Sequence, residues 1–497
     1  MEKYDLCVIG AGPSGYAAAM RAIDFGKKVI LIEKDKIGGA GLYNGALTSK
    51  TMWELSQKFR TVNSSIVSSG RSKFDITWDK VQKTMQEAMF DRKFQYSCHI
   101  KLLQSNELNQ IFRYERGFAS FVDQNNVKIT KANGDEKIIY ADNVIIAIGS
   151  TPRHLPNIQV DENIILTSNG VDSMKDFPKS MVIVGAGVIG CEYATMFSNF
   201  GKTKIYLIDR ADKILPFEDE DISQLIGNNL TKNGVTIHQN ANLERLEKRD
   251  GEVEYELSYK DGKKEVIRVE KALLSVGRVL NIEGLKMENA GVKLSKRGVH
   301  IGDTDTQTNV PNIYTVGDAS GHIALVNIGE LEARHAVERI FDNKKEKLNY
   351  TNISTIMFLQ PEVASVGMNE KQCLDRNIPV KIVKLDYSCI ARAIAMRKTE
   401  GFFKIIVTND DKMKILGMRA AGEHASSVIQ AVALLIKMNK GIHELAELVH
   451  PHPSIIEGVQ ECVRMLLNKS IFKSSIFKDK LWCYSCVDGV KTPLQRL

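Results

Sequence analysis

Residues 6–15 read Leu-Cys-Val-Ile-Gly-Ala-Gly-Pro-Ser-Gly, and residues 181–190 read Met-Val-Ile-Val-Gly-Ala-Gly-Val-Ile-Gly. In both stretches a short apolar run predicts a buried strand, and the Gly-x-Gly-x-x-Gly after it opens a helical segment. A second apolar strand follows at residues 29–33 and at residues 205–209. The same strand–turn–helix–strand device therefore occurs twice in the chain.

The glycine spacing in each device suits a bound dinucleotide. The first glycine permits a tight turn, the second lets the backbone approach a pyrophosphate, and the third allows close packing of helix and strand. Backbone N–H groups at the helix N-terminus then face the phosphates, and an acidic residue at the end of the second strand can hold ribose hydroxyls. The first device supplies Gly10, Gly12, Gly15 and Glu33, and the second supplies Gly185, Gly187, Gly190 and Asp209. Two complete devices predict two dinucleotide sites.

The rest of the sequence divides the chain further. A polar, helical stretch at about residues 48–109 precedes β-rich sequence, and from about residue 350 alternating strands such as 401–407 surround a long apolar helix near 425–438. We expect an α/β fold with two Rossmann-like domains, the second inserted in the first, and then an α+β domain. The predicted domains are 1–150 with 278–348, 151–277, 349–467, and a tail at 468–497.

Composition excludes several classes of function. The 497 residues include 43% hydrophobic and 26% charged residues with a formal net charge of +7, which is typical of a soluble globular protein. No basic patch favours nucleic-acid binding, and no apolar run of about 18 residues predicts a membrane span. The first strand begins near Tyr4, so no signal peptide is expected, and eight scattered cysteines favour the cytoplasm. No metal site is predicted.

Further motifs resemble one family. Residues 38–50 read Gly-Gly-Ala-Gly-Leu-Tyr-Asn-Gly-Ala-Leu-Thr-Ser-Lys, residues 311–318 contain Pro-x-Ile-Tyr-x-x-Gly-Asp, and residues 450–457 read His-Pro-His-Pro-Ser-Ile-Ile-Glu. With the two glycine-rich devices, these motifs are similar to the pyridine nucleotide–disulfide oxidoreductase family over about residues 4–467. Dihydrolipoamide dehydrogenase, glutathione reductase and the soluble transhydrogenases belong to it. The resemblance implies a homodimer built through the C-terminal domain, beginning at the family-like residues 361–367.

The resemblance also implies cofactors and their contacts. FAD would occupy the first device, and its further contacts would be Gly39, Lys50, Gly149, Gly317 and Asp318. A nicotinamide cofactor would occupy the second device, with Glu192 and Gly277 as further contacts. Asp209 favours NAD, because a carboxylate there repels the 2′-phosphate of NADP, although the adjacent Arg210 weakens this preference.

Four positions carry the implied chemistry. Lys50 would lie at the reactive edge of the flavin and pair with Glu192, where an ammonium stabilises charge on the reduced ring. His452 and Glu457 resemble the proton-shuttling pair that the partner subunit supplies to thiols in this family. Here that pair has two open interpretations: it protonates a different acceptor, such as a quinone oxygen, or it is a structural remnant that packs the dimer interface.

The segment 38–50 differs from the family's sequence at the positions that carry the family's redox chemistry. Gly41 and Ala46 stand at the positions of the two redox cysteines, Thr48 replaces a proline, and Ile148 replaces a threonine. Thiol–disulfide exchange needs a thiolate, so authentic dihydrolipoamide dehydrogenase activity is disfavoured. Loss of two side chains would also vacate a face of the flavin on which a flat acceptor can stack.

The tail contains a second candidate redox pair, Cys483 and Cys486, with the Cys-x-x-Cys spacing of thiols that resolve mixed disulfides. One hypothesis is that this pair substitutes for the missing disulfide. The other is that these are incidental or weakly metal-binding cysteines in a flexible tail.

The leading hypothesis is an FAD-dependent NAD(P)H oxidoreductase that reduces a non-dithiol acceptor, of which a quinone is the favoured example. Transhydrogenase activity, in which hydride returns to a second nicotinamide, requires the same two sites. A flavin-bound pseudoenzyme or redox sensor, and a disulfide reductase that uses the tail cysteines, are the further alternatives.

Overall fold

The computed structural model describes residues 1–68, 74–105, 107–295, 298–299 and 306–494. The chain divides into two compact units. Unit 1 comprises Met1–Phe177 and Leu273–Leu348, and unit 2 comprises Pro178–Ala272 and Asn349–Leu497. The prediction that a second nucleotide domain interrupts the first is confirmed, because 178–272 divides unit 1. That boundary lies later than the expected residue 151, and the C-terminal domain clusters with the inserted segment.

Unit 1 is built on a mostly parallel sheet. Its strands are β1 (Glu2–Ile9), β2 (Val29–Glu33), β3 (Phe112–Arg116), β4 (Phe118–Phe121), β5 (Asn126–Thr130), β6 (Glu136–Ile146) and β17 (Ile313–Thr315). They follow the order β3-β2-β1-β6-β5-β4, with β17 also beside β6, and the pairs among β1, β2, β3, β6 and β17 are parallel. This order places the turn after β1 at the carboxyl edge of the sheet, where dinucleotides bind.

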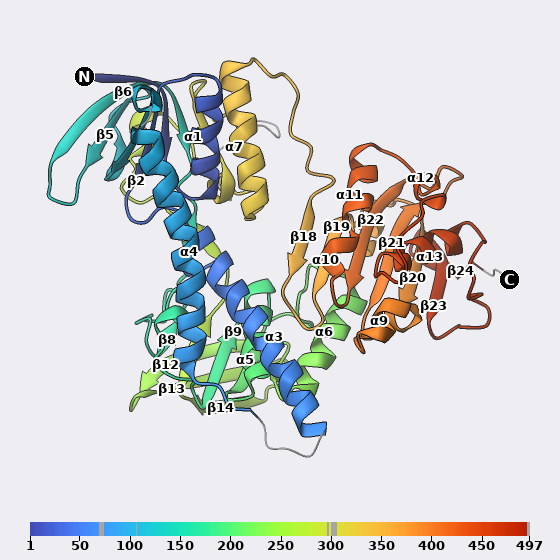
Figure 1. Ribbon diagram of the computed structural model, residues 1–497. Coiled ribbons are helices and arrows are strands. Elements are labelled where there is room, and N and C mark those ends of the chain that lie inside the picture. Colours follow the sequence, from blue (N-terminus) through green and yellow to red (C-terminus); the bar gives the residue numbers. More distant parts are fainter. Residues whose placement is uncertain (69–73, 106, 296–297, 300–305, 495–497) are drawn as a thin grey trace. The chain divides into compact units, whose positions relative to one another are not determined.

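The helices of unit 1 are α1 (Pro13–Asp24), α2 (Gly39–Leu42), α3 (Ala46–Ser68), α4 (Trp78–Ser105) and α7 (Val326–Phe341), and its short strands are β7 (Ser150–Pro152), β8 (Ile165–Leu166) and β16 (Arg278–Leu280). Helix α1 packs on β1 and β2, and α4 packs on β3. Helices α1 and α7 lie side by side (Figure 1). Their contact is close because Ala18, Ala22, Ala333 and Ala336 present small buried side chains to the same core.

The inserted part of unit 2 repeats the strand–helix–strand device. It contains β9 (Ser180–Val184), α5 (Val188–Phe200), β10 (Lys204–Ile208), α6 (Glu220–Lys232), β11 (Thr236–His238), β12 (Ala241–Arg249), β13 (Glu252–Tyr259), β14 (Lys264–Val269) and β15 (Lys271–Leu274), which crosses the unit boundary. Strands β9, β10 and β11 are parallel, and β12, β13 and β14 form an antiparallel sheet. The predicted fold class is therefore confirmed for both nucleotide domains.

The C-terminal part of unit 2 is an antiparallel sheet with helices. Its elements are β18 (Ser354–Met357), β19 (Val363–Gly367), α8 (Glu370–Asp375), β20 (Val380–Asp386), α9 (Ala391–Ala395), β21 (Phe402–Thr408), β22 (Ile415–Ala421), α10 (Ala425–Val428), α11 (Gln430–Lys437), α12 (His443–Ala446), α13 (Glu457–Leu466), β23 (Leu481–Val487) and β24 (Val490–Pro493). The sheet order is β18-β19-β22-β21-β20-β23-β24. The long helix expected near 425–438 is instead two helices, which Ile429 separates.

The predicted tail joins this sheet. Strand β23 pairs antiparallel with β20, and β24 pairs with β23. The interpretation of a flexible tail is therefore wrong for residues 481–493, because their backbone groups complete the sheet ladder. Residues 495–497 of the predicted tail lie outside the described residues.

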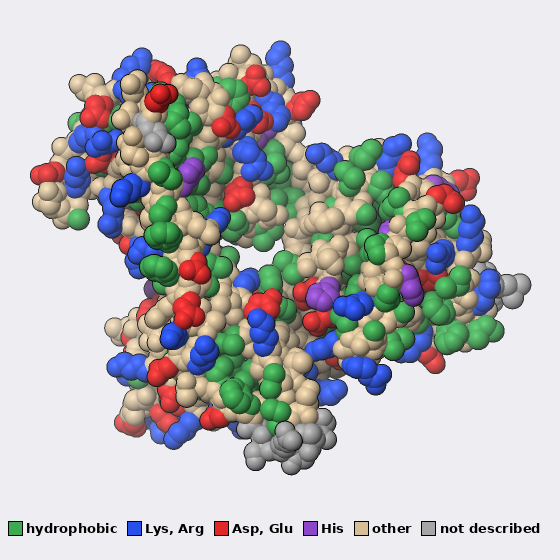
Figure 2. Space-filling view, viewed as in Figure 1, with side chains coloured by type: hydrophobic (Ala, Val, Ile, Leu, Met, Phe, Trp, Pro, Cys, Tyr) green, Lys and Arg blue, Asp and Glu red, His purple; other side chains and the backbone are tan. Residues whose placement is uncertain are grey.

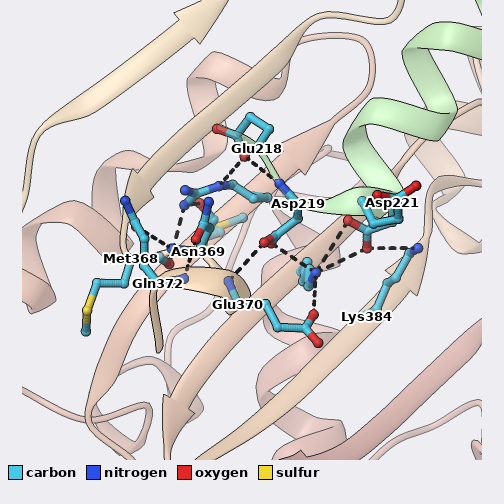
Figure 3. Close-up of polar contacts among 12 residues, drawn as sticks. Glu218, Asp219, Asp221, Met368, Asn369, Glu370, Gln372 and Lys384 are labelled. Atoms are coloured by element: carbon cyan, nitrogen blue, oxygen red, sulfur yellow. Dashed lines mark hydrogen bonds and ion pairs between the residues drawn. The ribbon is translucent and has the colours of Figure 1, made fainter. Parts of the chain in front are cut away.

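A buried charge cluster links the inserted and C-terminal parts of unit 2 (Figure 3). Nζ of Lys404 on β21 lies 3.0 Å from the carboxylate of Asp219 and 3.3 Å from that of Asp221, at the start of α6. Nε of Arg419 on β22 donates to Glu218 at 3.0 Å. Because Lys404, Arg419, Glu218 and Asp219 are almost fully buried, these pairs are shielded from solvent.

The surface carries both signs of charge. Basic and acidic side chains intermingle over the face shown in Figure 2. Within the part of the chain that the structure describes, no helix combines the length and apolar character needed to cross a membrane.

Candidate dinucleotide sites and the segment around Lys50

The first glycine-rich turn has room for a pyrophosphate. Gly10 follows β1 with φ of +103°, and a Cβ there would lie 2.4 Å from the carbonyl oxygen of Ala147, so the turn requires glycine. Gly12 caps α1 with extended backbone, and Pro13 follows at the first helical position. No atom lies within 4 Å of where a Cβ of Gly12 would stand. The open space before a helix N-terminus fits the phosphates of FAD.

The acidic residues of the two devices are held in the same way. One carboxylate oxygen of Glu33 accepts the N–H of Ala11 at 2.8 Å, and one of Asp209 accepts the N–H of Ala186 at 2.6 Å. The other oxygen of Glu33 accepts the N–H of Asp35, and the other oxygen of Asp209 accepts the N–H of Ala211, both at 2.8 Å. Each carboxylate is thus fixed beside its glycine-rich turn, with further lone pairs for ribose hydroxyls.

The second glycine-rich turn fits a nicotinamide dinucleotide by the same measures. Gly185 has φ of +100°, Gly187 caps α5, and no atom lies within 4 Å of a Cβ position at Gly187. Gly190 lies in the first turn of α5 and is buried. Gly277, the further predicted contact, belongs to unit 1 and has φ of +106°.

Asp318 lies in a polar network that sequence reasoning missed. The hydroxyl of Ser150 donates to the Asp318 carboxylate, and Arg278 donates to both Oγ and the carbonyl oxygen of Ser150 at 2.7 Å. The preceding Gly317 donates its N–H to the buried Glu332 at 2.7 Å. The network fixes Asp318 as an acceptor at the carboxyl edge of β17. The residues that build it are far apart in the sequence and belong to no single motif.

Helix α3 begins at one of the two positions where cysteine was expected. Ala46 is its first residue, and Lys50 follows four positions later on the same helical face. Gly39 approaches the first glycine-rich turn, since a Cβ there would lie 3.3 Å from Cα of Gly12. The segment therefore lies directly against the predicted FAD site.

The space beside Gly41 is closed, contrary to the expectation of a vacated face. A Cβ at Gly41 would lie 2.5 Å from Cγ of Pro13, in the first turn of α1, and 3.8 Å from Val326. The proline ring fills the volume in which a side chain would begin.

Glu192 is buried in α5, and its Oε1 accepts the backbone N–H of Phe358 at 3.0 Å. The predicted partner, Lys50, belongs to unit 1, whereas Glu192 belongs to unit 2. Their pairing stays a prediction.

The structure brings His452 and Glu457 together. Nδ1 of His452 lies 2.8 Å from Oε1 of Glu457, whose other oxygen accepts the N–H of Ser454 at 2.8 Å. Partial burial raises the pKa of Glu457, but the bonds from Ser454 and His452 lower it below its ordinary value overall. The imidazole is 70% exposed, so its ring can reach a group outside this protomer.

The tail cysteines do not form a redox pair. Cys483 and Cys486 lie three residues apart on β23, so their side chains point to opposite faces of the sheet. Cys483 packs in the core with Phe403, whereas Cys486 packs with Val380 and Ile382. All eight cysteines of the chain are free thiols. The hypothesis that this pair replaces the missing disulfide is wrong for this structure.

Comparison with known proteins agrees with this geometry. The chain matches the family described as Pyridine nucleotide-disulphide oxidoreductase over residues 4–333, and that family's dimerisation domain over residues 353–463. A dihydrolipoyl dehydrogenase from Bacillus subtilis (strain 168) is 32% identical over 468 residues, covering 94% of this chain and 97% of that protein. One from Geobacillus stearothermophilus is 34% identical over 467 residues, covering 93% and 96%.

Solved structures share the fold. LpdA from Mycobacterium tuberculosis has a TM-score of 0.84 at 23% identity and covers 94% of this chain and all of its own. The HOCl-induced flavoprotein disulfide reductase RclA from Escherichia coli, solved as a Cu(II) complex, has a TM-score of 0.82 at 24% identity, with coverage of 94% and 100%. The dimerisation-domain match supports a homodimer. The chain therefore belongs to the pyridine nucleotide–disulfide oxidoreductase family, whose members are FAD-dependent oxidoreductases that use a pyridine nucleotide.

Proposed function

We propose that this protein is an NAD(P)H oxidoreductase that reduces an acceptor other than a disulfide, and that the acceptor is a quinone. FAD, when bound, would supply the chemistry that takes hydride from the nicotinamide and gives electrons to the acceptor. The observation that carries the proposal is the pair Gly41 and Ala46, because neither residue offers a thiol beside the predicted flavin site.

Three cysteines, Cys7, Cys483 and Cys486, support the same conclusion. Cys7 is fully buried in β1, and burial raises the pKa of its thiol well above the usual range. The tail thiols face opposite sides of a sheet in the other unit. A disulfide acceptor needs a thiolate of the enzyme to attack one of its sulfur atoms. A quinone needs no thiolate, because its reduction adds electrons and protons to a carbonyl-containing ring and involves no sulfur.

The chain's own residues have three roles in this proposal. The ammonium of Lys50 stabilises negative charge near Ala46, on the same face of α3. His452, which the partner subunit supplies and which Glu457 orients, protonates the reduced acceptor. Asp209 selects NADH over NADPH, because its fixed carboxylate repels a 2′-phosphate.

Steady-state assays of the FAD-loaded homodimer test the proposal. We expect NADH oxidation with menadione and none with lipoamide, and the Cys486→Ala variant serves as a control that keeps menadione turnover. Comparable lipoamide turnover would refute the proposal. Faster turnover with a thionicotinamide acceptor than with menadione would favour a transhydrogenase. Failure of NADH to bleach the flavin absorbance without oxygen would favour a redox-inactive flavoprotein.

A further inference from the structure

A cavity of about 720 Å³ lies in unit 1 behind the start of α3, beside α4, and we call it the α3–α4 cavity. Residues from the loop after β2, the start of α3, helix α4, strand β3 and the segment 169–173 line it. Its size is within the range of small-molecule sites, about 300 to 1,000 Å³. None of the residues predicted to contact FAD lines it.

The cavity lies on a different side of α3 from the flavin-facing residues. Thr48 lines it and is almost fully buried. On a helix with about 3.6 residues per turn, Thr48 projects roughly 200° away from Ala46, whereas Lys50 shares the face of Ala46. The cavity is therefore a site separate from the acceptor position proposed above.

Asp172 supplies an unusual carboxylate to this cavity. It accepts hydrogen bonds from the Thr48 side chain and from the backbone N–H of Asn44, and Gln82 donates to its carbonyl oxygen at 2.8 Å. Burial raises the pKa of Asp172 to about 6, although the hydrogen bonds from Thr48 and Asn44 to its carboxylate lower it. Among the described residues no Lys, Arg or His forms a salt bridge with Asp172, so none of them neutralises this acceptor.

The other charged residues of the lining are at the exposed rim: Asp35, Lys36, Lys93 and Arg116. Arg116 donates to the carbonyl oxygen of Asp35 at 3.1 Å, which directs its guanidinium along this rim. Three cations against one carboxylate make the rim electropositive, and cations of this kind bind carboxylates well.

Apolar side chains form the surface between the buried acceptor and the rim. Ile37 and Met85 are buried, and Met89 is half-buried. The ring of Tyr43 lies 5.2 Å from Nζ of Lys36 and lines the same cavity. Thioether and aromatic groups contact flat rings favourably.

We propose that the α3–α4 cavity binds a small aromatic carboxylate that also carries a hydroxyl group. The carboxylate lies at Lys93 and Arg116, the ring contacts Met85 and Ile37, and the hydroxyl donates to Asp172. This inference goes beyond the proposed oxidoreductase function, since the ligand is not the electron acceptor. The ligand would contact the Asp172 carboxylate, which also accepts hydrogen bonds from Asn44 and Thr48. These two residues lie two positions before and two positions after Ala46.

Titration calorimetry of the FAD-loaded protein with 6-hydroxy-2-naphthoate at pH 8 tests the proposal, because Asp172 is ionised there. We expect 2-naphthoate, which lacks the hydroxyl, and 2-naphthol, which lacks the carboxylate, each to bind about tenfold more weakly. Binding to the flavin-loaded protein also shows that the ligand and FAD occupy separate volumes.

Three variants complete the test. Arg116→Ala, at an exposed position, and Asp172→Asn each weaken 6-hydroxy-2-naphthoate binding about tenfold. Lys83→Ala, which changes an exposed lysine on α4 outside the lining, leaves binding unchanged. Absence of binding to the wild type at about 1 mM, or equal binding by wild type and Arg116→Ala, overturns the proposal. Menadione reduction, measured in parallel, decides the proposed function independently.

Discussion

Nζ of Lys404 lies 2.8 Å from Oε2 of Glu370, and the same carboxylate receives two groups from the tail hairpin. The hydroxyl of Tyr484 donates to it at 3.0 Å, and Nζ of Lys491 lies 2.5 Å from its other oxygen. Burial alone would raise the pKa of Glu370, but Lys404 and Lys491 lower it to about 2. The tail therefore takes part in the buried charge cluster of unit 2.

Replacement of Lys404 with methionine tests this cluster. The variant leaves buried carboxylates without their cation, so we expect the free energy of unfolding to fall by about 3 to 5 kcal/mol. Lys371→Met is the matched control, because Lys371 forms an exposed pair with Asp375 at 3.2 Å and should cost less than about 1 kcal/mol. Chemical denaturation measures both, and equal losses in the two variants would contradict the expectation.

Gly41→Ala tests the closed space beside Pro13. The added Cβ would meet the proline ring at 2.5 Å and displace the start of α1, so we expect weaker FAD retention and a loss of about 1 to 3 kcal/mol in stability. Gly227→Ala, on α6, is the control, since a Cβ there meets one atom at 3.8 Å. Flavin release on dilution measures the effect, and full retention in Gly41→Ala would argue against a closed site.

His452→Gln distinguishes proton transfer from a structural role. If His452 protonates the acceptor, turnover with menadione falls by about 100-fold, while flavin reduction by NADH in a single turnover is unchanged. His443→Gln is the control, because His443 is exposed and contacts a backbone carbonyl oxygen. Undiminished menadione turnover would identify the His452–Glu457 pair as an interface element.

Asp209→Asn tests the choice of nicotinamide. Removal of the negative charge should raise kcat/KM for NADPH relative to NADH by about tenfold, because the 2′-phosphate no longer meets a carboxylate. Asp212→Asn, exposed in the same loop, should leave this ratio unchanged. An unaltered ratio in Asp209→Asn would assign the selectivity to another residue.

Asp172 predicts a pH dependence of stability. Its pKa is about 6 in the folded state and about 3.8 when unfolded, so between pH 4 and 6 the folded state binds more protons. The free energy of unfolding should therefore decrease as pH rises through this window, by at most about 3 kcal/mol. Denaturation of wild type and Asp172→Asn at pH 4.5 and 7.5 measures the difference, and parallel losses in both proteins would exclude Asp172 as the cause.

Local patterns predicted the nucleotide devices well. Leu6, Cys7 and Val8 are fully buried in β1, and the glycines after them form the expected turn before α1. A strand followed by a glycine-rich turn is specified within a few residues, so its sequence pattern is sufficient. The carboxylates Glu33 and Asp209 lie where the spacing placed them for the same reason.

Long-range contacts were beyond the sequence pattern. The side chain of Thr48 meets Asp172, and the ring of Pro13 fills the space beside Gly41, although no spacing rule relates these positions. For the tail cysteines, by contrast, a sequence pattern exists but the fold does not follow it. Their Cys-x-x-Cys spacing is that of a redox pair, but pairing with β20 places them on a strand, where three-residue spacing puts the side chains on opposite faces.

The pairing of β23 with β20 also bears on solubility. Without the tail, β20 would be the outermost strand of its sheet, with Val380, Ile382 and Leu385 beside unpaired backbone groups. Such an apolar edge invites pairing with other chains. The tail instead makes β24 the outermost strand, which is four exposed residues long and includes Lys491 and Pro493. A short edge with a lysine and a proline resists intermolecular strand addition, so the tail protects the protein against aggregation.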